Sequence, residues 1–183
     1  MGTLPPGPLL QTRRLRLVAS SLRHIEAELQ DPASLGAILG VAIPASWPPG
    51  EYDRDALEYF HGRLTQGGPS QVGWYGWYAV TTDSEGRCDS LIAAAGYFGP
   101  PSQGSVEIGF SVIPEARGHG YATEIAQALV ANAFDQPGVQ VVNARTADSN
   151  IPSTRVLLRC GFHRVGPGAE PGTGEYQIAR IGF

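Results

Sequence analysis

The segment from Val106 to Ala122, with the sequence VEIGFSVIPEARGHGYA, constrains the fold more than any other part of the chain. It predicts a strand that ends at Pro114, a turn around Gly118 and Gly120, and then an amphipathic helix. Glycines at such a turn leave several backbone N–H groups exposed at the positive end of the helix dipole. This arrangement binds phosphate or pyrophosphate. We therefore expect the chain to handle a phosphorylated cofactor.

Two common phosphate-binding motifs do not fit this segment. A nucleotide P-loop requires a Lys directly after its last glycine, and no Lys follows Gly118 or Gly120. A dinucleotide fingerprint requires a third glycine, and Thr123 stands in that position. Residues 114–117 also separate the strand from the first glycine. The cofactor must therefore be held by another kind of phosphate loop.

Composition and charge limit the class of protein. The chain has 183 residues, enough for one domain with a full hydrophobic core, and its net charge of −4 argues against a nucleic-acid partner. Cys88 and Cys160 lie in no C-x-x-C pattern and the four histidines are scattered, so we expect free thiols and no metal site. No leader and no long apolar run occurs, which predicts a cytoplasmic protein with no membrane partner.

The hydrophobic periodicity predicts the domain organisation. Residues 1–10 contain three prolines and are expected to form a flexible arm, and residues 11–183 a single domain. Alternating residues predict strands over 14–19, 75–82, 89–98, 105–113, 139–146, 162–165 and 175–181. Helices are expected over 21–30 and 32–39, from Asp53, after Gly120, and from Asn150 to Gly161. This order predicts an α/β (α+β) fold, a mixed sheet with helices on both faces.

The glycine loop and its surroundings resemble one family. Arg117 to Ala122 match the pattern Arg/Gln-x-x-Gly-x-Gly/Ala, the pyrophosphate-binding signature of the GNAT family of N-acetyltransferases. The strand before it, the downstream Asn150-x-x-Ser153 and the Gly161-Phe162 ending also resemble that family. The sequence QTRRLRL at residues 11–17 is similar to the opening "LxTxRLxLR" of the branch that acetylates ribosomal-protein N-termini. The resemblance implies a mostly antiparallel sheet of about six to seven strands.

The resemblance also implies acetyl-CoA as the cofactor, with no metal. Its pyrophosphate would be held by Arg117, Gly118, His119, Gly120, Tyr121 and Ala122. Phe110, Ser111 and Val112 would pair through their backbone with the pantetheine arm, as an added strand would. Asn150, by its match to the family's Asn, would hydrogen-bond the same arm. For His119 and Tyr121, a solvent-facing position is the alternative.

Acetyl transfer to an amine by direct attack in a ternary complex needs a base, an oxyanion donor and a proton for the leaving thiolate. Glu107 is the candidate base, acting through water, and an outward-turned strand residue is the alternative. The backbone N–H of Val112 is the oxyanion donor that the resemblance implies. Ser153 is the candidate acid in place of the family's Tyr, and a first-turn serine that bonds to backbone is the alternative. Cys160 is expected in the core rather than as a nucleophile.

The acceptor site should come from the first half of the chain, which is rich in aromatic residues. We expect Trp47 and Tyr97 to line it, with a core position as the alternative for each. The predicted acceptor is a primary amine, on either a protein N-terminus or a small molecule. A non-catalytic acyl-CoA-binding module on the same fold is the alternative function, because a fold alone does not fix an activity. The sequence leaves a homodimer open.

Overall fold

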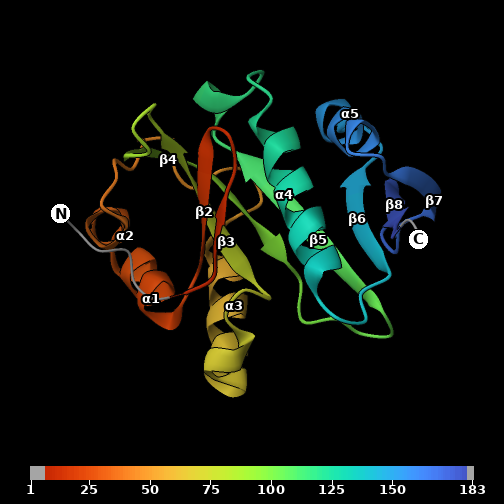
Figure 1. Ribbon diagram of the computed structural model, residues 1–183, viewed down its shortest axis with the longest axis horizontal. Helices are drawn as coiled ribbons and strands as arrows, with labels where there is room; N and C mark the ends of the chain where they lie inside the picture. The colour runs from red at the N-terminus through yellow and green to blue at the C-terminus, as the bar shows by residue number, and fades with distance from the viewer. Residues whose placement is uncertain (1–6, 181–183) are drawn as a thin grey trace.

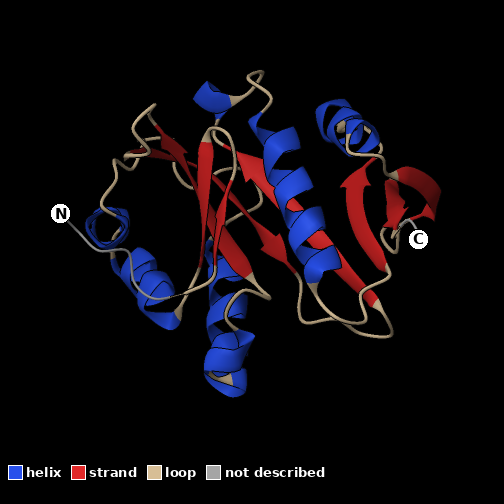
Figure 2. Cartoon of the chain, in the orientation of Figure 1, coloured by secondary structure: helices blue, strands red, loops and turns tan. Residues whose placement is uncertain are grey.

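A computed structural model describes residues 7–180, which form one sheet of eight strands with α-helices on both faces (Figures 1 and 2). The strands are β1 (Leu9–Gln11), β2 (Leu15–Ala19), β3 (Gly76–Thr82), β4 (Cys88–Tyr97), β5 (Ser105–Val112), β6 (Val141–Ala147), β7 (His163–Pro167) and β8 (Thr173–Ala179). The α-helices are α1 (Leu22–Gln30), α2 (Pro32–Leu39), α3 (Arg54–Gly67), α4 (Tyr121–Asp135) and α5 (Ile151–Arg159). Two short 3₁₀ turns lie at Pro69–Gln71 and Pro114–Ala116.

The sheet has one strand more than the sequence predicts, and the additional strand is β1. Its residues Leu9 and Leu10, expected in a flexible arm, pair antiparallel with Val18 and Leu17 of β2. Leu10 packs against the core, and the pairing covers the outer edge of β2. A strand of three residues is too short for alternation to reveal it. The rest of the predicted arm, residues 1–6, lies outside the described residues.

The strands follow the order β1-β2-β3-β4-β5-β6-β8-β7, and the sheet has a gap between β5 and β6. All neighbouring strands are antiparallel except β5 and β6, which run parallel. Their pairing ends at Ile108 and Ala144. Beyond that point residues 109–112 pair only with β4, and residues 145–147 pair only with β8. The two strands therefore part toward the N-termini of α4 and α5 (Figure 1).

The helices lie on two faces of the sheet, because alternate side chains of its strands contact different helices. Tyr78 of β3 packs against His24 of α1, with ring centroids 5.9 Å apart. On the opposite face, the Tyr97 hydroxyl donates to the Leu129 carbonyl of α4 at 2.7 Å. Helices α2 and α3 lie against α1, and α5 lies against α4. The predicted helices on both faces are confirmed.

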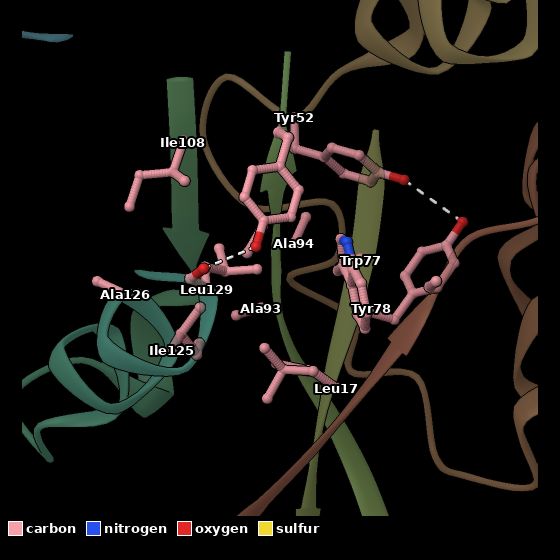
Figure 3. Close-up of a cluster of buried hydrophobic side chains, with 14 of the residues drawn as sticks. Leu17, Tyr52, Trp77, Tyr78, Ala93, Ala94, Ile108, Ile125, Ala126 and Leu129 are labelled. Atoms are coloured by element: carbon pink, nitrogen blue, oxygen red, sulfur yellow. Dashed lines mark hydrogen bonds between the residues drawn. The ribbon is translucent and has the colours of Figure 1, made fainter. Parts of the chain in front are cut away.

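The core between β5 and α4 follows the predicted periodicity of the helix (Figure 3). Ile125, Ala126, Leu129 and Ala133 are fully buried, and Ile108 of β5 is 1% exposed. These side chains fix the position of α4 on the sheet, since burying each large apolar group contributes about 1.5–3 kcal/mol. The N-terminus of α4 is thereby held at the end of β5.

Most helices begin where a capping side chain is available. Asp53 accepts a hydrogen bond from Ala56 N–H at the start of α3, and Asn150 accepts one from Ser153 N–H at the start of α5. The sequence predicts that helices begin at Asp53 and Asn150, and both starts are confirmed. Helix α4 differs, because it begins at Gly120 with no side-chain cap. None of the helices in the described part of the chain has the length and apolar character that a membrane span requires.

Candidate active site

The loop before α4 presents unpaired backbone amides. Gly118 and Gly120 have φ values of +77° and +80°, a left-handed conformation that glycine adopts without strain. Within residues 7–180, the amides of residues 118–123 donate to no backbone or side-chain acceptor. A Cβ on Gly118 would meet nothing within 4 Å, so the space beside this residue is open. This arrangement suits an anion at the positive end of α4.

Side chains of the turn between β1 and β2 hold this loop in place. Arg14 donates from Nε to Glu124 of α4 at 2.8 Å, and from Nη1 to the His119 carbonyl at 2.9 Å. Thr12 Oγ1 donates to the same carboxylate at 2.5 Å. The Arg14 guanidinium also lies 4.4 Å from the centre of the Tyr121 ring. Burial raises the pKa of Glu124, but the hydrogen bonds from Thr12 and Arg14 outweigh it and keep that pKa below its usual value.

The end of β5 has a free backbone edge. Ile113 N–H donates to the Ile92 carbonyl of β4, so the odd-numbered residues of β5 bond to β4. The even-numbered residues therefore direct their N–H and C=O groups to the other side. At Phe110 and Val112 that side is the gap left by β6. The Val112 carbonyl accepts from Arg117 Nε at 3.0 Å, whereas the amides of Phe110 and Val112 face the gap.

A hollow of about 490 Å³ lies at this gap, between the N-termini of α4 and α5. Its lining includes Ser111, Val112, Gly118, Gly120, Asn150 and Ser153. We call it the α4–α5 hollow. The Asn150 side-chain oxygen caps α5, which leaves its Nδ2 group free to donate to a ligand. The amide of Ser153, and not its hydroxyl, bonds to Asn150, so the hydroxyl also has no partner among the described residues.

A second hollow, of about 430 Å³, lies against α3 and is called the α3 hollow. Its lining includes Gly50, Glu51, Tyr52, Phe60, Phe98 and Gly109. The two hollows share Phe110, Ser111, Arg117 and Asn150 in their linings. They therefore meet where β5 and β6 part. A ligand in one hollow can reach a ligand in the other across the end of β5.

Comparison with known proteins identifies the family. Residues 14–163 match the profile described as "Acetyltransferase (GNAT) domain". The chain belongs to the GNAT family of acetyltransferases. Members of this family use acetyl-CoA and act on amine acceptors. The resemblance deduced from the glycine loop is confirmed.

Individual relatives agree with this assignment. The chain is 28% identical over 155 residues to the uncharacterized N-acetyltransferase YjdG of Bacillus subtilis (strain 168), covering 84% of this chain and 89% of that protein. The fold is similar to the ribosomal-protein-S5-alanine acetyltransferase of Vibrio fischeri (TM-score 0.62, 16% identity, 94% and 96% of the two chains). It is equally similar to RimL, a ribosomal L7/L12 alpha-N-protein acetyltransferase solved with coenzyme A (TM-score 0.62, 16% identity, 94% and 98%).

Glu107, the predicted base of this GNAT protein, lies on β5 on the same face as Ser111. It forms a two-pronged ion pair with Arg145 of β6, with N–O distances of 2.8 and 2.9 Å. The Glu107 side chain is 23% exposed. It lines neither hollow, and four residues of extended strand, about 13 Å, separate it from Ser111. Glu107 as a base therefore stays a prediction, and it requires a chain of water molecules.

The two predicted acceptor residues lie in the core. Trp47 is 7% exposed and donates from Nε1 to the buried Glu28 carboxylate at 2.6 Å, and it lines neither of the two hollows. Burial raises the pKa of Glu28, and the hydrogen bonds from Tyr78, Trp47 and Tyr52 oppose that effect. Tyr97 borders the α3 hollow, but it is 1% exposed and its hydroxyl bonds to α4. The structure therefore does not bring Trp47 to the site.

Of the two aromatic residues of the glycine loop, Tyr121 borders the α4–α5 hollow and His119 does not. His119 directs Nδ1 toward the Arg117 carbonyl at 2.8 Å and stacks on Tyr121 with a centroid distance of 6.0 Å. Tyr121 is held between His119 and Arg14 and borders the α4–α5 hollow. His119 is exposed and does not line that hollow.

Sequence reasoning missed the roles of Thr12, Arg14 and Glu124. The signal was present, since Thr12 and Arg14 belong to the QTRRLRL segment that resembles the ribosomal-protein branch. Their partner Glu124 lies 110 residues from Arg14, which no local pattern reveals. Among residues 7–180, no group of three or more His, Cys, Asp or Glu side chains is arranged to hold a metal ion.

Proposed function

We propose that the protein transfers the acetyl group of acetyl-CoA to a primary amine by direct attack in a ternary complex. The observation that carries this proposal is the pair of hollows that meet at the end of β5. The α4–α5 hollow has the features of a cofactor site, and the α3 hollow is open to a second ligand. Two ligands that meet there are positioned for a single transfer step without an enzyme-bound intermediate.

The α4–α5 hollow holds acetyl-CoA. The amides of residues 118–123 receive the pyrophosphate, supported by their lack of internal partners and by the open space at Gly118. The backbone of Phe110 pairs with the pantetheine arm, because its amide faces the gap, and the Val112 amide is left for the acetyl group. Asn150 Nδ2 donates to the same arm.

The acetyl carbonyl lies at the Val112 amide in this proposal. An N–H that is held by the sheet and has no partner among residues 7–180 stabilises the oxyanion of the tetrahedral intermediate. The Ser153 hydroxyl, which also lines the α4–α5 hollow, donates a proton to the leaving thiolate and regains one, through water, from the nitrogen that has attacked. Both groups border the same cavity from opposite sides, on β5 and α5.

Glu107 takes the proton of the bound ammonium group through water, and the ion pair with Arg145 fixes the carboxylate. The neutral amine that results attacks the acetyl carbon from the α3 hollow. Direct attack is also supported by the state of Cys160. Burial raises the pKa of this thiol to about 11, so it is not a thiolate nucleophile at neutral pH.

Initial-rate kinetics test this function. Thiol release from acetyl-CoA is measured against polyamines, aminoglycosides, aliphatic and aromatic amines, and N-terminal peptides, and the products are identified by mass. A ternary complex predicts that double-reciprocal plots intersect and that acetyl-CoA alone leaves no acetyl group on the protein. Parallel plots with an acetylated protein would contradict direct attack. Coenzyme A binding without thiol release across the whole panel would instead support a non-catalytic binding module.

A further inference from the structure

The α3 hollow has apolar walls made of aromatic rings. Tyr52, Phe60 and Phe98 border it, and Phe98 is 52% exposed although it is a large apolar residue. Gly96 and Gly109, which carry no side chain, also border it. A Cβ on Gly109 would lie 3.1 Å from the Phe98 ring, so that ring lies directly over the strand. A compact apolar group fits against the exposed faces of such rings.

Glu51 is the one acidic residue among the residues that line this hollow. Its side chain is exposed and forms no hydrogen bond or ion pair within residues 7–180. The Arg117 guanidinium, the one basic group in the lining, bonds to the Val112 carbonyl instead. A carboxylate without a partner beside an apolar surface attracts a cation.

The backbone around Glu51 is held on both sides. The preceding residue, Gly50, lies so close to β5 that a Cβ there would approach Ser111 Oγ to 2.7 Å. The following residue, Tyr52, is buried and its hydroxyl donates to Glu28 at 3.1 Å. A carboxylate on an anchored loop loses little conformational freedom when it binds a ligand.

Three other acids, none of which lines the hollow, already have partners. Asp53 caps α3 through Ala56 N–H, Glu115 accepts from the Ser46 hydroxyl at 2.7 Å, and Glu28 is buried among its three donors. Among the residues that line the hollow, Glu51 therefore offers the single anionic contact. A ligand with several positive charges would find one partner for one charge, and its remaining charges would lie against aromatic rings and small residues.

We propose that Glu51 binds the ammonium group of the acceptor, and that the acceptor is a primary amine with one positive charge and a compact apolar or aromatic body. This inference rests on the proposed function and specifies its substrate class. Two sources share the required chemistry: a free arylalkylamine, and the first residue of a peptide with an aromatic side chain. Glu51 acts before the chemical step, by raising the local concentration of the ammonium form.

Kinetics with three amines test the substrate class. The probes are 2-phenylethylamine, spermidine, and the N-terminal peptide Phe-Ala-Ala, each with saturating acetyl-CoA. We expect kcat/KM for 2-phenylethylamine or for the peptide to exceed that for spermidine at least tenfold, and the ratio of the first two identifies the source. A preference for spermidine overturns the inference and leaves the proposed function intact. No turnover with any amine contradicts the proposed function itself.

Variants of this chain test the role of Glu51. Glu51→Gln is expected to raise KM for the preferred amine about tenfold, the effect of one partly exposed charge-assisted hydrogen bond, with kcat within threefold and CoA affinity unchanged. Glu58→Gln is the matched control, because it removes the same charge from α3 at a residue that pairs with Arg54 and does not line the hollow. Equal KM changes in the two variants would overturn the role of Glu51.

A substitution of the exposed ring separates the apolar part of the inference from the charge. Phe98→Ala is expected to raise KM for 2-phenylethylamine at least fivefold while leaving KM for ethylamine within twofold, because only the first amine has a ring to contact. Titration of 2-phenylethylamine into the CoA-loaded protein gives the same comparison without turnover. Equal effects on both amines would contradict the apolar contact.

Discussion

The glycine loop before α4 provides the sharpest test of cofactor binding. Gly118→Ala and Gly120→Ala each place a Cβ on a residue with a left-handed φ of +77° or +80°. A Cβ on Gly118 would meet no atom within 4 Å, and one on Gly120 would lie 3.6 Å from Arg14 Nη2, an ordinary contact. The substitutions therefore act through backbone strain and not through a clash within the free protein.

The magnitude follows from the conformation. A left-handed backbone costs a residue other than glycine about 1–2 kcal/mol. Because this loop is exposed, it can relax in the free protein, and binding must then restore the original conformation. The strain appears in the dissociation constant of coenzyme A, which we expect to increase about 5- to 30-fold, since each 1.4 kcal/mol is a factor of ten.

Calorimetric titration with coenzyme A measures the effect, and Gly138→Ala is the matched control. Gly138 has a φ of +85°, and a Cβ there would also meet nothing within 4 Å, but it follows the opposite end of α4. The control should lower the free energy of unfolding by about 1–2 kcal/mol and leave CoA affinity unchanged. Unchanged affinity in both Gly118→Ala and Gly120→Ala would refute the assignment of this loop to the pyrophosphate.

Three further predictions concern residues around this framework. Arg14→Gln removes the half-exposed contact to the glycine loop. Calorimetry should show that the affinity for coenzyme A is about fivefold weaker, or roughly 1 kcal/mol, and an unchanged affinity would contradict the role of Arg14 in positioning this loop. Burial, assisted by the charge of Arg23, lowers the pKa of His24 from 6.5 to about 4, so the unfolded state binds the proton first as the pH falls. As the pH is lowered from 6.5 to 4, the free energy of unfolding of the wild type, measured with urea, should fall by up to about 3 kcal/mol more than that of His24→Gln, which keeps a capping side chain. Parallel pH profiles of the two proteins would contradict this. Glu107→Gln should reduce kcat about 100-fold in thiol release without changing CoA affinity, and full activity would exclude Glu107 as the base.

Local patterns in the sequence predicted the elements that depend on neighbouring residues. The caps at Asp53 and Asn150 and the buried stripe of α4 are set within one or two helical turns, so composition and spacing reveal them. The glycine pattern at residues 117–122 likewise identified the family, because close approach to a phosphate requires particular residues at particular spacings.

Contacts between distant segments were beyond such reasoning. Glu28 lies on an amphipathic helix and gives no sign that it is buried, yet it accepts hydrogen bonds from Trp47, Tyr52 and Tyr78. That network draws Trp47 into the core and explains why it does not reach the α3 hollow. The strand pairing that places Glu107 opposite Asn143, within reach of the Arg145 side chain, is equally a property of the folded sheet. The acceptor site therefore required the structure.

A crystal structure with coenzyme A and 2-phenylethylamine tests the central claim most directly, that the two hollows at the end of β5 receive donor and acceptor. The account predicts the pyrophosphate on the amides of residues 118–123, the thiol beside the Val112 amide, and the amine in the α3 hollow with its nitrogen near Glu51. Coenzyme A bound away from the N-terminus of α4, or an amine bound outside the α3 hollow, would contradict it.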